Sequence, residues 1–383
     1  MGIVGPEQGE IILGDPVPWF GAPLIAGGSF HLQVAAGRWI VLAFLGSPAD
    51  PHAEAELAEL TREAALFDPD RIVFYGVLTT PPPDPAPYLK LCTAALSFIA
   101  DYDGAVSRAF GAADAPRTIV LDPMLRAVAN VSWTEPAGHA PTVRAVLRSL
   151  PAVDDAAGVP LCAPVLIVPR IFDFALCDVL VRFYDKLGGK DSGFLFDVEG
   201  KTTRVVDYRL KRRSDLDVAH PQLREAIRSQ IVRRLVPAIA QYFQFEATRM
   251  DRRIVACYDS AVGGHFHRHR DNVNIGAQHR RFAVTINLNG DYEGCDLIFP
   301  EFGSRHYRAP HGGAVVFSCG ALHQVTPITR GRRYAFLAFL YGEADAALRE
   351  ANNARLHETA APYAAESDRL FAGEAAAAER RAG

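Results

Sequence analysis

The sequence has few cysteines, no long apolar run and no strong excess of either charge. Its six cysteines include no C-x-x-C pair, which argues against a zinc ribbon, a thioredoxin-type redox pair and a dense disulfide framework. No apolar run approaches the roughly 20 residues of a membrane-spanning helix, and the first residues lack the basic and apolar regions of a secretory signal. A formal net charge of −4 gives no field that would attract nucleic acid or anionic lipid. We therefore expect a cytoplasmic protein with neither nucleic acid nor membrane as partner.

Apolar residues, by contrast, are plentiful. Hydrophobic residues make up 49% and charged residues 22% of the 383 positions, which is typical of a globular protein with full cores. This length favours more than one domain. A Pro- and Ala-rich stretch at 150–170 separates two regions of different pattern. We expect a first domain over 1–155, a second over 156–345 and a helical or disordered tail over 346–383.

The first region alternates apolar runs of strand length with helical segments. Residues 39–46 and 71–78 are continuous apolar runs, as in strands that are covered on both faces. A helix is expected after the first run, with Asp50 as its N-cap. Residues 117–123 and 127–133 are interpreted as a hairpin. This order predicts an α/β domain of the thioredoxin-like class.

Over most of residues 10–150 the chain resembles the peroxiredoxin (AhpC/TSA) family. The similarity lies in "LGDPVPWFGAPLIAGGSFHL", "WIVLAFLGSPAD", "FIADYDGAVSRAFG" and "PRTIVLDPMLR". That family needs a peroxidatic thiolate after the first core strand, and here the loop 46–57 contains no cysteine; no other side chain replaces a thiolate nucleophile. Cys92 lies far along the chain and is interpreted as a structural thiol. We therefore expect a peroxidase fold without peroxidase chemistry.

The second region begins with helices and continues as strands. Residues 173–187 and 222–245 carry apolar positions at three- and four-residue intervals, which indicates amphipathic helices. Five β-branched and aromatic runs follow: 253–260, 282–289, 295–300, 312–318 and 332–341. This pattern predicts an α+β domain, a double-stranded β-helix (jelly roll) with helices packed on one face.

The segment "HFHRHRD" is the candidate metal site. On a regular strand His265, His267, His269 and Asp271 would share one face. Alternate positions lie about 7 Å apart, so only two neighbours can chelate one ion. A histidine, a carboxylate and a distal histidine form the facial triad of non-haem Fe(II) sites, which favours His269 and Asp271. The first two histidines are interpreted as exposed loop residues, with substrate contact as the alternative.

A third ligand has to come from a later strand. The candidates are His279, His306, His311 and His323. The last of these lies at the start of a strong strand, and Arg333 follows ten residues later. Arginine offers a bidentate, permanently charged partner for a remote carboxylate. The spacing therefore favours His323 with Arg333.

From about 165 to 342 the chain resembles the Fe(II)- and 2-oxoglutarate-dependent dioxygenases, in their prolyl 4-hydroxylase-like branch. The similar stretches are "LKRRSD", "ACYDSAVGGHFHRHRDN", "VTINLNGDYEGCDLIFPEFG" and "GALHQVTPITRGRRYAFLAFLY". The resemblance implies that His269, Asp271 and His323 bind iron and act in catalysis. It also implies Fe(II), 2-oxoglutarate and O₂ as cofactor and cosubstrates, with ascorbate as a further candidate.

The same resemblance implies a cosubstrate pocket. Arg333 would hold the distal carboxylate of 2-oxoglutarate, and Tyr258 would line the pocket. Thr285 or Asn287 would contribute from the next strand. Cys295 departs from the family's usual glycine, which implies a change at the pocket mouth.

The basic run before the metal motif has two interpretations. Arg212, Arg213 and Ser214 lie in a stretch that faces substrate in the related enzymes, but a solvated basic run is an equal reading. The implied activity is hydroxylation of a prolyl residue of a peptide or protein, or of a small molecule, with release of succinate and CO₂. The alternative is a thiol-dependent peroxidase, or a redox-partner binding protein, that uses the N-terminal domain. The sequence leaves the oligomeric state open.

Overall fold

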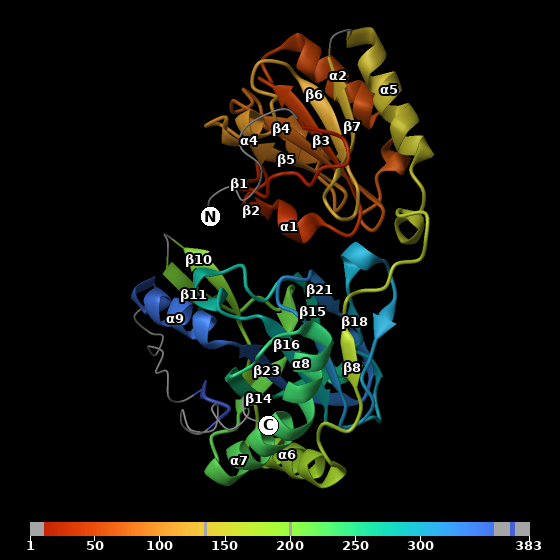
Figure 1. The fold of residues 1–383 in the computed structure, drawn as a ribbon. Coiled ribbons are helices and arrows are strands. Elements are labelled where there is room, and N and C mark those ends of the chain that lie inside the picture. The colour runs from red at the N-terminus through yellow and green to blue at the C-terminus, as the bar shows by residue number, and fades with distance from the viewer. Residues whose placement is uncertain (1–10, 134–135, 199–200, 356–367, 372–383) are drawn as a thin grey trace. The chain divides into compact units, whose positions relative to one another are not determined.

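The computed structural model describes residues 11–133, 136–198, 201–355 and 368–371 (Figure 1). The chain forms two compact units. The N-terminal unit comprises Met1–Ala163 and Phe299–Arg305, and the C-terminal unit comprises Pro164–Ile298 and His306–Gly383. The two-part layout expected from the sequence is confirmed. Within the described part of the chain, no helix is long and apolar enough to cross a membrane.

A mixed five-stranded sheet forms the centre of the N-terminal unit. Its strand order is β5-β4-β3-β6-β7, with β3, β4 and β5 parallel and the last two antiparallel. The strands are β3 (Trp39–Gly46), β4 (Ile72–Leu78), β5 (Leu96–Ala100), β6 (Arg117–Leu121) and β7 (Ala127–Ser132), beside a hairpin of β1 (Gly21–Pro23) and β2 (Ser29–His31). The helices are α1 (Leu32–Ala35), α2 (Pro51–Thr61), α3 (Ala86–Leu91), α4 (Ala105–Ala109) and α5 (Pro136–Ser149). Strand β3 is buried along most of its length, as its continuous apolar sequence requires.

The start of α2 is where the peroxiredoxin family places its thiolate. Asp50 caps the helix by accepting a hydrogen bond from the backbone N–H of His52 at 2.9 Å, and Ala53 is buried in the first turn. Cys92 follows α3, and its thiol donates to the carbonyl of Tyr88 at 3.4 Å. Burial raises the pKa of the Cys92 thiol, which makes it a poor nucleophile. The structure thus places no reactive cysteine near this loop.

Two antiparallel sheets form the C-terminal unit. The larger has the order β8-β20-β16-β23-β14-β13-β9, and the smaller β12-β15-β21-β18-β19. The larger sheet consists of β8 (Leu166–Val168), β20 (Ala314–Ser318), β16 (Phe282–Asn287), β23 (Arg332–Tyr341), β14 (Arg249–Asp259), β13 (Ser214–Asp217) and β9 (Lys190–Asp191). The smaller consists of β12 (Lys211–Arg212), β15 (His265–His269), β21 (His323–Val325), β18 (Leu297–Ile298) and β19 (His306–Tyr307). Two further pairs are β10 (Phe194–Val198) with β11 (Lys201–Val205), and β17 (Glu293–Gly294) with β22 (Ile328–Arg330).

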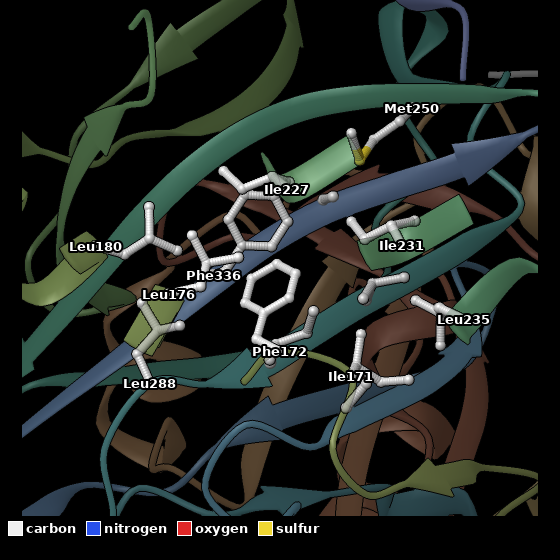
Figure 2. Packing of buried hydrophobic residues seen from close by; sticks show 14 of the residues in the cluster. Ile171, Phe172, Leu176, Leu180, Ile227, Ile231, Leu235, Met250, Leu288 and Phe336 are labelled. Carbon is white, nitrogen blue, oxygen red and sulfur yellow. The ribbon is translucent and has the colours of Figure 1, made fainter. Parts of the chain in front are cut away.

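Helices cover one face of the larger sheet. They are α6 (Phe174–Leu187), α7 (Pro221–Gln230) and α8 (Val236–Phe243), and α9 (Glu343–Ala351) follows β23. Figure 2 shows side chains of α6 and α7 gathered around Phe336 of β23, which contacts the ring of Phe172 at a centroid distance of 5.3 Å. Because side chains alternate along a strand, Arg333 and Leu337 of the same strand face the cavity described below. Strand β23 therefore contributes side chains to the hydrophobic core on one face and to the cavity on the other.

The structure departs from the expected long helix at 222–245. Residues Ile231–Leu235 form a π-helical turn between α7 and α8. Pro237, the second residue after this turn, has no N–H to continue an α-helical pattern. Most of the expected tail lies outside the described residues. Its described part includes the last six residues of α9, 346–351, and Leu370, whose backbone N–H donates to the carbonyl of Thr248 at 2.9 Å.

Candidate metal centre

Three side chains converge at one end of the smaller sheet. His269 ends β15 and is the direct cross-strand neighbour of His323, which begins β21. Asp271 follows in a turn, and its own backbone N–H donates to the carbonyl of Cys319 at 2.9 Å. The ligand atoms of the three side chains lie within 4.8 Å of one another. The Nε2 atoms of the two histidines lie 3.6 and 3.5 Å from the two carboxylate oxygens of Asp271.

Backbone carbonyls orient both imidazoles. Nδ1 of His269 lies 2.7 Å from the carbonyl of His267, and Nδ1 of His323 lies 3.1 Å from that of Ala321. A carbonyl only accepts, so each Nδ1 carries the hydrogen and each Nε2 directs its lone pair toward Asp271. Burial, and next the neighbouring His323, hold the pKa of His269 well below its usual value. His269 is therefore a neutral imidazole, the form that binds a metal.

A bulge decides which histidines enter the site. Phe266 pairs with Val325 and His269 with His323, so β15 has one residue more than its partner between these pairs. Phe266 and His269 consequently both line the cavity, and their rings stack at a centroid distance of 3.5 Å. His267 is exposed. The interpretation of His265 and His267 as exposed loop residues is wrong in part, because both belong to β15 and His265 is half-buried. The bulge breaks the alternation of a regular strand, so the four polar residues of the motif do not share one face.

The other candidate histidines lie elsewhere. His279 is buried and lies 3.3 Å from Asp251. His306 is an exposed partner of Asp296 at 3.1 Å. His311 stacks on an aromatic ring of α6. None of these three belongs to the group around His269.

Arg333 is a buried cation with neutral partners. Its guanidinium donates to the side-chain oxygens of Asn287 and Thr285 at 3.0 Å each, and to the carbonyl of Cys295 at 3.2 Å. It is only 4% exposed. Among the described residues, no carboxylate pairs with it. A buried charge without a counterion is costly, so the site is built for an anionic ligand.

Tyr258 lies beside this cation. It is the cross-strand neighbour of Arg333 on β14, and its ring centre is 5.7 Å from the guanidinium carbon. Its hydroxyl accepts from Arg213 at 3.4 Å. Arg213 in turn holds Asp215 through two bonds of 2.7 and 2.8 Å. Of the predicted pocket residues, Tyr258 and Thr285 line the cavity. Asn287 does not line it: its side-chain oxygen accepts from Arg333, and its amide nitrogen donates to the carbonyl of Ala309 at 2.6 Å.

One cavity of about 80 Å³ joins these groups. By this measure a water molecule needs roughly 10–15 Å³, so the space is large enough for more than one water molecule. Its apolar wall includes Phe266, Leu297, Phe317 and Leu337. Besides the three convergent side chains, the polar lining consists of Lys211, Arg213, Arg252, Tyr258, Thr285 and Arg333.

The sequence interpretation missed two of these basic residues. It noted the run at 212–214 but not Lys211, which is buried and donates to the carbonyl of Gly193 at 2.9 Å. Alternation along 211–215 is a signal that groups Lys211 with Arg213, both of which line the cavity. Arg252 gave no signal, because it lies at an irregularity of β14.

Comparison with known proteins agrees with this geometry. Residues 254–341 match the family model of the 2OG-Fe(II) oxygenase superfamily, and residues 13–128 match that of the AhpC/TSA family. Both resemblances expected from the sequence are confirmed. Residues 254–341 are thus similar to the 2OG-Fe(II) oxygenase superfamily, a class of proteins that uses Fe(II), 2-oxoglutarate and O₂.

Similar individual proteins cover parts of the chain. A "PKHD-type hydroxylase" of Synechococcus sp. is 28% identical over 94 residues, 23% of this chain and 41% of the relative. A protein of the same description from Pseudomonas paraeruginosa is 34% identical over 88 residues, 21% and 38% of the two chains. The chain thus spans about two fifths of the length of these curated relatives.

Two solved structures resemble the two units remotely. A prolyl hydroxylase from Trichoplax adhaerens, in complex with a hypoxia inducible factor peptide fragment, is 18% identical, with 48% and 86% of the two chains covered and a TM-score of 0.40. Peroxidoxin BcpB from Mycobacterium tuberculosis is 21% identical, with 37% and 99% covered and a TM-score of 0.32.

Proposed function

We propose that the C-terminal unit is an Fe(II)- and 2-oxoglutarate-dependent dioxygenase. It hydroxylates a prolyl residue of a peptide or protein, or a small molecule, and releases succinate and CO₂. The two facing sheets form a double-stranded β-helix. The observation that carries the proposal is that Arg333, a buried cation without a counterion, lines the same cavity as His269, Asp271 and His323.

The donor set fits Fe(II). Two neutral imidazole nitrogens and one carboxylate oxygen match the ligand types of a non-haem iron site that keeps open positions. The carbonyl bonds to Nδ1 of His269 and His323 fix the orientation of both rings, as outer hydrogen bonds do for metal-bound histidines. These three residues would hold the ion.

A bound Fe(II) would supply the redox chemistry by which O₂ gives one oxygen atom to 2-oxoglutarate, forming succinate and CO₂, and the other to a C–H bond of the substrate. The chain's own residues position the reactants. Arg333 binds the remote carboxylate of 2-oxoglutarate, with Thr285 and Asn287 holding the guanidinium in place. Tyr258 closes the pocket beside it. The apolar wall of Phe317 and Leu337 excludes water.

The N-terminal unit is, on this proposal, a thioredoxin-like domain without catalysis of its own. Its loop after β3 carries no thiol, and Cys92 has a raised pKa and a hydrogen bond to a carbonyl. No observation favours the alternative of a thiol-dependent peroxidase.

The test is succinate formation from 2-oxoglutarate under air, with and without added Fe(II) and ascorbate. We expect Fe(II)-dependent succinate, and a KM for 2-oxoglutarate that rises about ten- to a hundredfold in Arg333→Gln, since charge-assisted hydrogen bonds are lost. Arg330→Gln is the matched control, because Arg330 is an exposed partner of Glu293 on the preceding strand. No succinate from the wild type at any iron concentration would contradict the proposal.

A further inference from the structure

Two basic side chains of the cavity form no ion pair with any residue that the structure describes. Lys211 is 3% exposed, and its ammonium donates to the carbonyl of Gly193 and lies 4.6 Å from the ring centre of Phe266. Arg252 lines the same cavity and is half-buried. Among the described residues, neither forms an ion pair with a carboxylate. Burying a cation in this way is unfavourable unless a ligand supplies the opposite charge.

The backbone of Arg252 is also unusual. It lies in the left-handed region, with φ of +56°, which a long side chain adopts rarely. The pairing of β14 shifts register between Asp251 and Ile254, so Arg252 occupies the bulge. Strain of this kind persists where the surrounding structure imposes it, commonly at binding sites. The bulge is what brings this guanidinium into the cavity lining.

The carboxylates nearby are already engaged. Both oxygens of Asp215 accept from Arg213, and one of them also accepts from Ser192. Asp271 faces the two histidines of the metal centre. In the proposed function Arg333 takes the remote carboxylate of 2-oxoglutarate. Lys211 and Arg252 therefore remain for a second anion.

We infer that the substrate hydroxylated in this cavity is itself anionic, and that Lys211 and Arg252 bind its carboxylate or phosphate group. This inference rests on the proposed function and names the substrate class of the same site. The inference predicts that substrates with an oxyanion near the reacting carbon bind in this cavity and that neutral substrates bind less well.

The electrostatics of both groups support the inference. Burial, and next the nearby Arg213, hold the pKa of Lys211 well below its usual value. Burial and the nearby Arg280 lower the pKa of Arg252. For both groups, burial and the neighbouring cations outweigh the attraction of the nearby carboxylates of Asp215, Asp251 and Asp271. A bound oxyanion relieves both effects.

The experiment uses the full-length protein loaded with Mn(II) in place of Fe(II), with 2-oxoglutarate at saturation. The probes are inorganic phosphate and acetate, which distinguish a phosphate from a carboxylate site. Paramagnetic broadening of the phosphorus signal of phosphate, or of the carbon signal of acetate, reports binding near the metal. The Zn(II)-loaded protein gives the diamagnetic reference.

We expect saturable broadening of at least one probe, with a Kd that rises about ten- to a hundredfold in Lys211→Met and Arg252→Gln. Arg212→Gln is the matched control, because Arg212 stacks on Tyr208 at 3.9 Å and does not line the cavity. Unchanged broadening in both variants would show that the anion binds the metal directly and would overturn the inference. So would a wild type that binds 2-oxoglutarate but neither probe. Failure to bind 2-oxoglutarate would instead reject the proposed function.

Discussion

At the scale of single residues, the metal centre depends on groups behind its ligands. The Phe266 ring stacks on the imidazole of His269 at a centroid distance of 3.5 Å. The carbonyl of His267 accepts a hydrogen bond from Nδ1 of that imidazole, which leaves Nε2 for the metal. Removing such an orienting partner typically lowers metal affinity about 10–100-fold.

We predict that Phe266→Ala weakens Fe(II) binding about tenfold, the lower end of that range, because the carbonyl bond remains. Phe266→Leu, which keeps an apolar surface, should lose less. Anaerobic titration with Fe(II) measures both. Equal affinity in the wild type and Phe266→Ala would mean that the carbonyl alone orients His269.

The spacing of histidine, aspartate and arginine along the sequence was enough to predict the central residues of the site. Sequence alone singled out His269, Asp271, His323 and Arg333, and the structure brings all four to one cavity. Their role as ligands stays a prediction. Spacing could not find Arg252, since a bulge in one strand has no mark in the sequence of that strand alone.

At the scale of elements, an ion pair ties the start of α9 to β14. Glu343 accepts two bonds from Arg249 and one from Thr248. The Arg249 side chain is 5% exposed, whereas that of Glu343 is 63% exposed. The hydrogen bonds from Arg249 lower the pKa of Glu343 to about 2, from its ordinary 4.5.

Because the folded state binds this proton less readily than the unfolded state, the pair stabilises the fold above pH 4.5. The contribution disappears as the pH falls toward 2. We predict that Glu343→Gln lowers the Tm at pH 6 and that the difference from the wild type disappears near pH 2. Thermal unfolding across this range measures it. Glu293→Gln is the control: its partner Arg330 is 66% exposed, so its effect should be small. A difference in Tm between Glu343→Gln and the wild type that stays the same at every pH would contradict the proposed link between the pKa of Glu343 and stability.

The long apolar strands could be predicted, and the short ones could not. Strand β3 has the bounds expected from its sequence, because eight apolar residues in succession leave few alternatives. Strands β12 and β18 have two residues each and owe their existence to the strands beside them. The π-helical turn at Ile231–Leu235 was missed because apolar periodicity barely distinguishes it from an α-helix.

At the scale of the whole molecule, the C-terminal core should govern the stability of the site. Phe336 is fully buried between α6, α7 and the larger sheet (Figure 2). We predict that Phe336→Ala lowers the free energy of unfolding by about 3–5 kcal/mol. Tyr242→Ala, at a 63% exposed position on α8, should stay within about 0.5 kcal/mol. Urea unfolding measures both, and a small loss in Phe336→Ala would contradict this core assignment.

The N-terminal unit provides a separate prediction. Without a thiol after β3, the protein should not turn over hydrogen peroxide with dithiothreitol as reductant. Cys92→Ser should behave like the wild type, because the partly buried thiol is bonded to a carbonyl and its pKa is raised. Peroxide consumption that disappears in Cys92→Ser would restore the peroxidase alternative.

The measurement that tests the central claim most directly is anaerobic Fe(II) binding by the wild type, His323→Ala and His267→Ala. The account predicts stoichiometric iron in the wild type and in His267→Ala, whose imidazole lies outside the site. It predicts loss of iron in His323→Ala, where one of three ligands is removed. Iron retained in His323→Ala, or lost equally in His267→Ala, would show that the metal is held by a different set of residues.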